Sequence, residues 1–440
     1  MSYCAYITTI RELRKHSNAD RLQCATIFGN NVIVDLSYQV GQRVVYFPVD
    51  GQLGEEFARD NNLVRVKDGN GNNVGGYLDP EKRNITALKL RGEKSDGLVL
   101  PIEVLSKYTN IDKLSDGDQI SILNGHEICR KYIPRGNRNR QRTQQTSKTK
   151  KSKKEQNEKV TYPYFVEHID TAQLAYNQNA FRPGDTCYIT LKMHGTSART
   201  MNAVEVTTKR RHKLIKKLFN LKDKETRRYK VVSGTRRVTL RDYDGGYYGS
   251  NAFRQKYHDF FKDRLPKGAE IFYEIVGWVD DNTTIMGRCQ NKLIKDKEFS
   301  KQYGVETVFS YGCEKGQNDC YVYRMTMTNE DGFAVELPWE AVQIECEKMG
   351  VKCVPTFDKF IFTTWEDLME RVERYYDGPD PVGLTHVREG VVIRIDNRQS
   401  FTAFKHKNFS FKCLEGMIKD TSDAPDMEEA EDLIVEDMAA

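Results

Sequence analysis

Five charged residues from position 192 onward have the types and spacing that phosphate chemistry requires. The first, Lys192, ends an alternating run that begins at Cys187, and it is followed by His194 and Gly195. A lysine that is buried or flanked by cations loses proton affinity, and its amine then becomes a nucleophile. The glycine allows the backbone to approach a ligand closely. Lys192 is therefore a candidate nucleophile, although an edge lysine before a turn would give the same short pattern.

The other four residues could surround such a nucleophile with carboxylates and amines. Glu274 interrupts one apolar run, and Glu389 directly precedes another. A buried carboxylate is costly unless it contacts a cation, a metal or a sugar hydroxyl. Lys405 and Lys407 are two residues apart in an extended segment, so both side chains are expected on one face. The pattern indicates a polar site in which carboxylates and amines face a ligand.

The segments that carry these residues are predicted to be mainly strands. Alternating or apolar runs predict strands over residues 187–190, 201–206, 231–233, 270–277, 308–312 and 390–395. Aromatic residues over 251–265 predict a surface helix, and the spacing of apolar residues over 209–219 predicts an amphipathic basic helix. We therefore expect strands to position the charged residues.

The pattern of short strands and turns over residues 3–105 predicts a small β-barrel. Short strand-like runs cover residues 24–28, 31–35 and 43–47, and turn residues such as Gly29-Asn30 and Gly41-Gln42 separate them. Many short strands with few long helices are typical of small barrels.

Two segments of the chain are strongly charged and poor in large apolar residues. Residues 131–159 contain 11 lysines and arginines against two glutamates, which gives 11 − 2 = +9. Nine aspartates and glutamates lie between positions 420 and 437. Such compositions cannot offset chain entropy by burial, so a disordered basic linker at 121–160 and a disordered acidic tail at 419–440 are predicted. The linker would attract phosphates.

Cysteine spacing and hydropathy give expectations about metal sites and location. No two of the 10 cysteines have the CxxC spacing of a zinc or dithiol site. No apolar run approaches the length of a membrane span, and no signal peptide opens the sequence. An intracellular, cytoplasmic protein without a membrane partner is expected, and the basic linker leaves a nuclear location open.

The order of the charged motifs resembles that of the covalent nucleotidyltransferase superfamily, which includes polynucleotide ligases and capping enzymes. The matching positions are Lys192-Met193-His194-Gly195, Arg236, Glu274, Tyr311, Glu389, Lys405 and Lys407. The histidine at the third position of the first motif resembles the motif of RNA ligases. DNA ligases and capping enzymes usually have aspartate at that position. The phrase Asn18-Ala19-Asp20-Arg21-Leu22 resembles OB-type nucleic-acid-binding domains. An OB domain in front of the catalytic one resembles the nick-sealing branch of the RNA ligases.

This resemblance implies an α+β fold with a defined order of domains. An OB-fold nucleic-acid-binding domain, an OB-type β-barrel, would cover residues 1–120, and the linker would follow over 121–160. An RNA ligase adenylyltransferase domain, a nucleotidyltransferase fold of antiparallel sheets with flanking helices, would cover 161–418. The acidic tail would occupy 419–440.

The resemblance also implies a role for each motif residue. Lys192 would take AMP from ATP, Glu274 would hold the ribose or a metal, and Glu389 would organise the metal. Lys405 and Lys407 would neutralise charge on the α-phosphate in the transition state. The other nucleotide contacts would be His194, Gly195, Arg236 and Tyr311, with Arg237 and Phe309 as alternatives to the last two. Contacts with nucleic acid are expected from Lys89, Arg91 and Arg237.

The implied activity is ATP-dependent RNA ligation with a divalent metal, Mg²⁺ or Mn²⁺. A monomer would join the 3′-OH and 5′-phosphate ends of a nicked duplex, of broken RNA or of an RNA–DNA hybrid. A DNA ligase and an RNA capping guanylyltransferase are alternatives within the superfamily. A non-catalytic OB-type RNA-binding protein is the alternative from another class.

Overall fold

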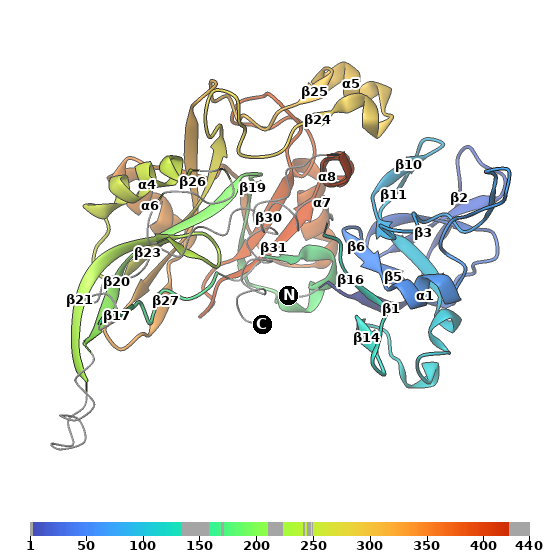
Figure 1. Cartoon of the computed structure of the whole chain (residues 1–440), viewed down its shortest axis with the longest axis horizontal. Coiled ribbons are helices and arrows are strands. Elements are labelled where there is room, and N and C mark those ends of the chain that lie inside the picture. Colours follow the sequence, from blue (N-terminus) through green and yellow to red (C-terminus); the bar gives the residue numbers. More distant parts are fainter. Residues whose placement is uncertain are drawn as a thin grey trace.

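The computed structural model describes residues 3–133, 158–168, 171–209, 223–240, 243, 248 and 250–421. Figure 1 shows a small part formed by the N-terminal residues beside a larger part formed by the rest of the chain. No helix within these ranges is long and apolar enough to cross a membrane. Most of the basic linker, the basic helix and the acidic tail fall in residues 134–157, 210–222 and 422–440, outside the described residues.

The N-terminal part, residues 3–133, consists of short strands around its own apolar core, in which Ile7, Val45, Phe47 and Phe57 are fully buried. Its elements are β1 Ala5–Thr9, β2 Leu13–Lys15, β3 Leu22–Ile27, β4 Asn30–Asp35, β5 Arg43–Phe47, β6 Gly51–Leu53, α1 Glu55–Asp60, β7 Val66–Lys67, β8 Asn73–Gly75, β9 Asn84–Ile85, β10 Leu88–Leu90, β11 Glu93–Ser95, β12 Leu98–Pro101 and β13 Gln119–Ile120. The strands pair as β12-β5-β1-β13, β2-β3-β4 and, with β16 Cys129–Lys131, β16-β6-β9, beside smaller hairpins. No single sheet closes on itself within residues 3–133, so the OB-type barrel stays a prediction.

The predicted start of the basic linker at residue 121 is too early. Strands β14 Ile122–Leu123, β15 His126–Glu127 and β16 Cys129–Lys131 follow β13, and β16 pairs with β6 of the N-terminal part. Ile128 and Cys129 are buried in its core. The strands were missed because each is only two or three residues long, which is too short to show an alternating pattern.

The described residues of the larger part form two main sheets, mostly antiparallel, with helices around them. The first has the order β22-β21-β20-β23-β26-β27, with β17 beside β20 and β28 beside β26; its strands are β17 Glu158–Thr161, β20 Thr196–Lys209, β21 Lys224–Gly234, β22 Thr239–Leu240, β23 Ala269–Gly277, β26 Asn318–Thr328, β27 Ala334–Glu336 and β28 Lys352–Cys353. The second has the order β18-β31-β30-β19-β29; its strands are β18 Ala172–Gln173, β19 Thr186–Lys192, β29 Thr356–Ile361, β30 Gly390–Ile395 and β31 Thr402–Lys407. The mostly antiparallel sheets and the few helices around them agree with the predicted α+β class.

Among the described residues, five α-helices and a small strand pair complete this larger part. They are α4 Ala252–Lys262, α5 Lys297–Tyr303, α6 Trp339–Met349, α7 Trp365–Tyr375, α8 Phe409–Thr421, β24 Cys289–Gln290 and β25 Glu306–Thr307. The predicted helix at 251–265 corresponds to α4, whose Phe253, Tyr257 and Phe261 are buried. Helix α7 packs against the second sheet, where Leu368 and Val372 meet Ile189 and Ile393.

The chain crosses from one sheet to the other at the Lys192 motif. Strand β19 of the second sheet ends at Lys192, and β20 of the first sheet begins at Thr196. The two parts of the molecule also touch near this crossing. Lys412 of α8 forms an ion pair with Asp96, and the ring of Tyr176 stacks on Tyr6 with centroids 4.3 Å apart. The motif therefore lies between the two sheets and close to the N-terminal part.

Candidate active site

The Lys192 motif is a tight turn that packs against strand β23 of the first sheet. A Cβ on Gly195 would lie 2.4 Å from the Ile275 carbonyl oxygen, so only glycine fits this turn. The backbone N–H of His194 donates a 2.7 Å hydrogen bond to the hydroxyl of Tyr311. The turn is thereby fixed against β23 and the segment that contains Tyr311.

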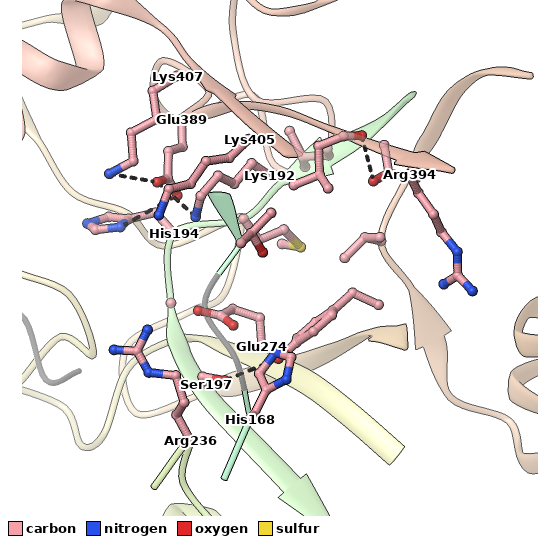
Figure 2. A pocket seen from close by; sticks show the side chains of 18 of the residues that line it. His168, Lys192, His194, Ser197, Arg236, Glu274, Glu389, Arg394, Lys405 and Lys407 are labelled. Atoms are coloured by element: carbon pink, nitrogen blue, oxygen red, sulfur yellow. Dashed lines mark hydrogen bonds and ion pairs between the residues drawn. The ribbon is translucent and has the colours of Figure 1, made fainter. Parts of the chain in front are cut away.

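Strand β30 brings Glu389 between two lysines of neighbouring strands. Gly390, its first residue, pairs with Lys192 on one side and with Lys407 on the other. Glu389 Oε1 lies 2.9 Å from Lys192 Nζ and 3.3 Å from Lys407 Nζ. Oε2 of the same carboxylate lies 3.8 Å from His194 Nδ1. Figure 2 shows these side chains converging on Glu389 at one wall of the pocket.

The electrostatics of this cluster reverse one expectation from the sequence. Burial alone would lower the pKa of Lys192, but the carboxylates of Glu389 and Glu274 outweigh it, and the pKa is raised above its usual value. Burial would raise the pKa of Glu389, yet Lys192 and Lys407 lower it overall. The expected loss of proton affinity at Lys192 is therefore wrong for the free protein, because a carboxylate contacts the amine.

A cavity of about 180 Å³ opens beside this cluster. Among the predicted site residues, its walls include Lys192, His194, Gly195, Arg236, Glu274, Glu389, Lys405 and Lys407. Figure 2 shows Glu274 and Arg236 on the wall opposite Glu389 and Lys407. Residues far apart in sequence are thus brought together in one pocket, as the order of the motifs predicted.

Tyr311 and Phe309 lie behind the motif rather than on the walls given for this cavity. Both rings are almost completely buried, and the Tyr311 hydroxyl is engaged by His194. Partly exposed rings at the cavity wall are those of Phe401 and of Tyr323 of β26. The Tyr323 hydroxyl is 3.2 Å from Ser197 Oγ, and its ring lies 5.8 Å from that of His168. Stacking of Tyr311 on adenine stays a prediction that this geometry does not favour.

Several cavity residues were missed by the sequence reasoning. Asp50 and Lys131 reach the cavity from the N-terminal part, and His168 and Tyr323 line it from the larger part. The alternation of Tyr321, Val322 and Tyr323 could have pointed to β26, which pairs with the Glu274 strand. Nothing in the local sequence marks Lys131, which the prediction placed in the linker.

The predicted nucleic-acid contacts lie away from the cavity. Lys89 in β10 forms an ion pair with Asp296, which bridges the two parts of the chain. Arg91 is exposed in the turn between β10 and β11, where its φ is +49°. Arg237 follows Arg236 but is not among the residues that line the cavity. These three side chains are not brought together with the motif residues.

The site and fold agree with the class that the motif order implied, a covalent nucleotidyltransferase. A sequence model described as RNA ligase matches residues 185–414, which is more than half of the 440-residue chain. The chain belongs to the RNA ligase family, and the predicted resemblance to RNA ligases is confirmed.

Solved structures of the RNA ligase of Naegleria gruberi have a similar fold. A mutant with ATP and Mn aligns with 93% of this chain and 98% of its own, with 19% identity and a TM-score of 0.56. The enzyme with PPi aligns with 96% of this chain and 99% of its own, with 17% identity and a TM-score of 0.55. At these identities the likeness shows the fold alone, over both parts of the chain. No curated protein sequence gives a significant match.

Proposed function

We propose that this protein joins RNA 3′-OH and 5′-phosphate ends in an ATP-dependent reaction that passes through AMP bound to Lys192. The observation that carries the proposal is the contact of Lys192 with Glu389 in a cavity that Arg236, Lys405 and Lys407 also line. Membership of the RNA ligase family gives the reaction class. The similar Naegleria gruberi structures with ATP and Mn, and with PPi, agree with ATP as the donor of AMP.

In the first step the Lys192 amine would attack the α-phosphorus of ATP. The new bond joins nitrogen to phosphorus, and the bond to pyrophosphate breaks. The ammonium must first lose a proton to solvent, because the Glu389 carboxylate 2.9 Å away stabilises the charged form and opposes this loss. Lys405 and Lys407 would stabilise the charge that develops on the phosphoryl oxygens.

The next two steps would use the same cavity. An oxygen of the RNA 5′-phosphate attacks the α-phosphorus of the AMP, and the Lys192 amine leaves. The RNA 3′-hydroxyl then attacks the 5′-phosphorus, and AMP leaves as the phosphodiester forms. Arg236 presents a planar guanidinium that suits a phosphate better than a lysine would.

The cavity fits a divalent metal that is bound with the help of phosphate. Glu389 Oε2 is buried and makes no hydrogen bond, so this oxygen can face a cation. Within the described ranges, no group of three or more His, Cys, Asp and Glu side chains could hold an ion. Glu389 and Glu274 would therefore share the metal with phosphate oxygens and water, as Mg²⁺ and Mn²⁺ prefer. When bound, the metal would offset the charge of the transferring phosphate.

The contacts with RNA remain proposals as well. Arg91 and Arg237 carry guanidinium groups outside the cavity, where they could bind phosphates without taking part in the chemistry. Lys89 already pairs with Asp296, so its contribution would require that ion pair to open. We therefore expect Arg91→Ala to weaken RNA binding more than Lys89→Ala.

A sealing assay tests the proposed reaction. The wild-type protein is incubated with ATP, Mg²⁺ and end-labelled RNA that carries a 5′-phosphate and a 3′-OH. Joined product should form with ATP and should not form with GTP, with 3′-deoxy ends or with the Lys192→Ala variant. Joining that survives Lys192→Ala would reject the proposal, and so would a failure of the wild-type protein to seal any RNA substrate.

The substrate can be narrowed with the same assay. The motif resemblance predicts sealing at a nick in a duplex, and broken single-stranded ends are the other candidate. Nicked duplexes with RNA or DNA on each side, compared with single-stranded ends, would rank these substrates by rate. A preference for DNA on both sides would favour the DNA ligase alternative.

A further inference from the structure

Lys407 lines three adjoining cavities between the N-terminal part and the rest of the chain. The first is the active-site cavity. The second, of about 70 Å³, shares Asp50 and Gln173 with it, and the third, of about 640 Å³, shares His406 and Lys412 with the second. Together they form a groove that leads from the outer, largest cavity to the Lys407 amine. Figure 1 shows α7 and α8 on the side of the larger part that faces the N-terminal strands.

The outer cavity presents aromatic rings from both parts of the chain. Phe28, in the turn between β3 and β4, faces it from one side, and Trp365 and Tyr376 face it from the α7 side. All three rings are partly exposed. Aromatic rings that are free on one face are the platforms on which unpaired bases stack, and such stacking is independent of base sequence.

Polar groups that suit a sugar-phosphate backbone lie between these rings. Asn30, Asn31 and Gln178 place amide groups there. The Asn31 amide also donates to the Lys94 carbonyl oxygen, and the Asn30 amide donates a long 3.5 Å bond to the Tyr46 hydroxyl. Amide side chains can donate hydrogen bonds to phosphate oxygens and also read base edges. The outer cavity thus combines stacking surfaces with hydrogen-bond donors.

Net charge alone would not select a polyanion here. Four cations and three carboxylates line the outer cavity, which gives 4 − 3 = +1: Arg11, Lys94, Lys407, Lys412, Glu12, Asp96 and Glu373. Asp96 is paired with Lys412, and Lys94 lies over the Phe409 ring at 5.3 Å. The amine of Lys407 stands at the active-site end of the groove, where it contacts Glu389 at 3.3 Å and Glu415 at 2.8 Å. An incoming phosphate would therefore share this amine with the two carboxylates.

We propose that this groove binds the single-stranded RNA end that carries the 5′-phosphate and guides it to Lys407. This inference rests on the proposed ligase function and specifies its substrate. The middle cavity, of about 70 Å³, is the smallest of the three, so this route suits a single strand rather than a duplex. Bases near the 5′ end stack on Trp365, Tyr376 and Phe28, while the terminal phosphate reaches the amine that also serves the AMP phosphate. Broken single-stranded ends are therefore preferred to a nick, in which both ends are base-paired.

Steady-state sealing of single-stranded RNA with changes in the groove tests the inference. Trp365→Leu removes a stacking ring, and Arg11→Glu reverses a charge at the outer cavity. Trp365→Leu should raise the KM for 5′-phosphorylated RNA by about 10-fold, since stacking on one ring contributes about that factor. Arg11→Glu should raise the same KM, because it replaces a cation with a carboxylate that repels the RNA phosphates. Gln178→Glu, at an exposed position, adds a negative charge in the groove without disturbing packing. It should raise the same KM even if Trp365→Leu folds poorly.

Matched variants outside the groove serve as controls. Lys113→Glu reverses an exposed charge of the N-terminal part, and Phe333→Leu removes an exposed ring of the larger part. Neither should change the KM for RNA. The amount of Lys192-bound AMP in each preparation gives the active fraction, so that rates are compared per active molecule.

The outcomes separate this inference from the proposed function. Groove variants with the KM of the wild type, or controls that raise KM equally, would overturn the groove while leaving the ligase intact. Faster sealing of a nicked duplex than of single-stranded ends would also overturn it. A wild-type protein that neither labels at Lys192 nor seals RNA would reject the proposed function, and the groove inference with it.

Discussion

The contact between Lys192 and Glu389 keeps the Lys192 amine protonated in the free protein. Glu389 holds the ammonium 2.9 Å away and keeps the pKa of Lys192 raised, despite burial that acts in the opposite direction. The free protein therefore carries an unreactive lysine. Lys407, 3.3 Å from the same carboxylate, provides a second cation for Glu389 once the amine has reacted. The order of motifs predicted these partners, but only the geometry shows that Glu389 opposes deprotonation.

The first prediction concerns the pH dependence of Lys192 labelling by ATP. Because the pKa of Lys192 is raised, the amine is protonated at neutral pH, and its reactive fraction grows as pH rises. The second-order rate of labelling at low ATP, which reflects the free protein, should increase about tenfold per unit between about pH 7.5 and 9. Rapid-quench measurements at fixed ionic strength would show this. A flat profile over that interval would contradict it.

The second prediction assigns Tyr311 a supporting role for the motif turn. Its hydroxyl accepts the His194 N–H at 2.7 Å, so Tyr311→Phe leaves a buried N–H without a partner. That loss costs about 1–3 kcal/mol. We expect Lys192 labelling to slow by about tenfold or more, in proportion to that free energy.

The same variant separates two roles for Tyr311. If its ring stacked on adenine, phenylalanine would preserve activity, since the ring is retained. Tyr323→Leu is the companion change, because it removes a partly exposed ring that does line the cavity. We expect it to raise the KM for ATP. Full labelling by Tyr311→Phe would contradict the supporting role.

At the scale of elements, the site depends on β30 lying between β19 and β31. One residue, Gly390, pairs with both Lys192 and Lys407, which fixes Glu389 between the two amines. A side chain on Gly390 would place a Cβ 2.1 Å from the His406 carbonyl oxygen, and its φ of +145° also favours glycine. This close approach keeps the lysine strands in register.

The third prediction is that Gly390→Ala disables the site. The added methyl must push β31 away, which costs about 1–3 kcal/mol of unfolding free energy and separates Lys407 from Glu389. Lys192 labelling should fall at least about tenfold, as that free energy implies. Gly184→Ala is the control, since its φ is also positive but its Cβ would meet no atom within 4 Å. Equal effects of the two changes on labelling would contradict the argument.

The sequence predicted the strands and the motif residues, because strand alternation and the motif order are local or serial signals. Glu274, Glu389, Lys405 and Lys407 were found in this way. Asp50 and Lys131 were not, because they reach the cavity only through the packing of the N-terminal part against the larger part. Tyr323 was missed for a related reason: the register of β26 beside β23 decides which of its rings faces the cavity, and a single sequence does not contain that register.

At the scale of the whole molecule, the N-terminal part is tied to the catalytic part rather than loosely attached. Lys89 pairs with Asp296, Lys412 pairs with Asp96, and the Cys413 thiol contacts the Ala87 carbonyl oxygen. His406 lies in β31 near this contact, and burial, with Lys412, lowers its pKa to about 4. Such a group makes stability depend on pH.

The fourth prediction follows from His406, together with His194, whose pKa burial also lowers to about 4. An unfolded histidine takes up a proton near pH 6.5, before the folded one does, so stability should fall as pH drops from about 6.5 to about 4. Each histidine contributes up to about 3 kcal/mol of this loss. Thermal melts of His406→Gln should show a shallower decline than wild type. His126→Gln, at a partly exposed position beside Glu56, is the comparison variant. An unchanged slope in His406→Gln would contradict the prediction.

The central claim is that Lys192 becomes covalently bound to AMP. Incubation with ATP and Mg²⁺, followed by intact-mass and peptide mass spectrometry under denaturing conditions, measures it directly. The account predicts a mass increase of one AMP that maps to Lys192, that pyrophosphate removes and that Lys192→Ala abolishes. A protein that gains no AMP, or that carries AMP on another residue, would contradict the account.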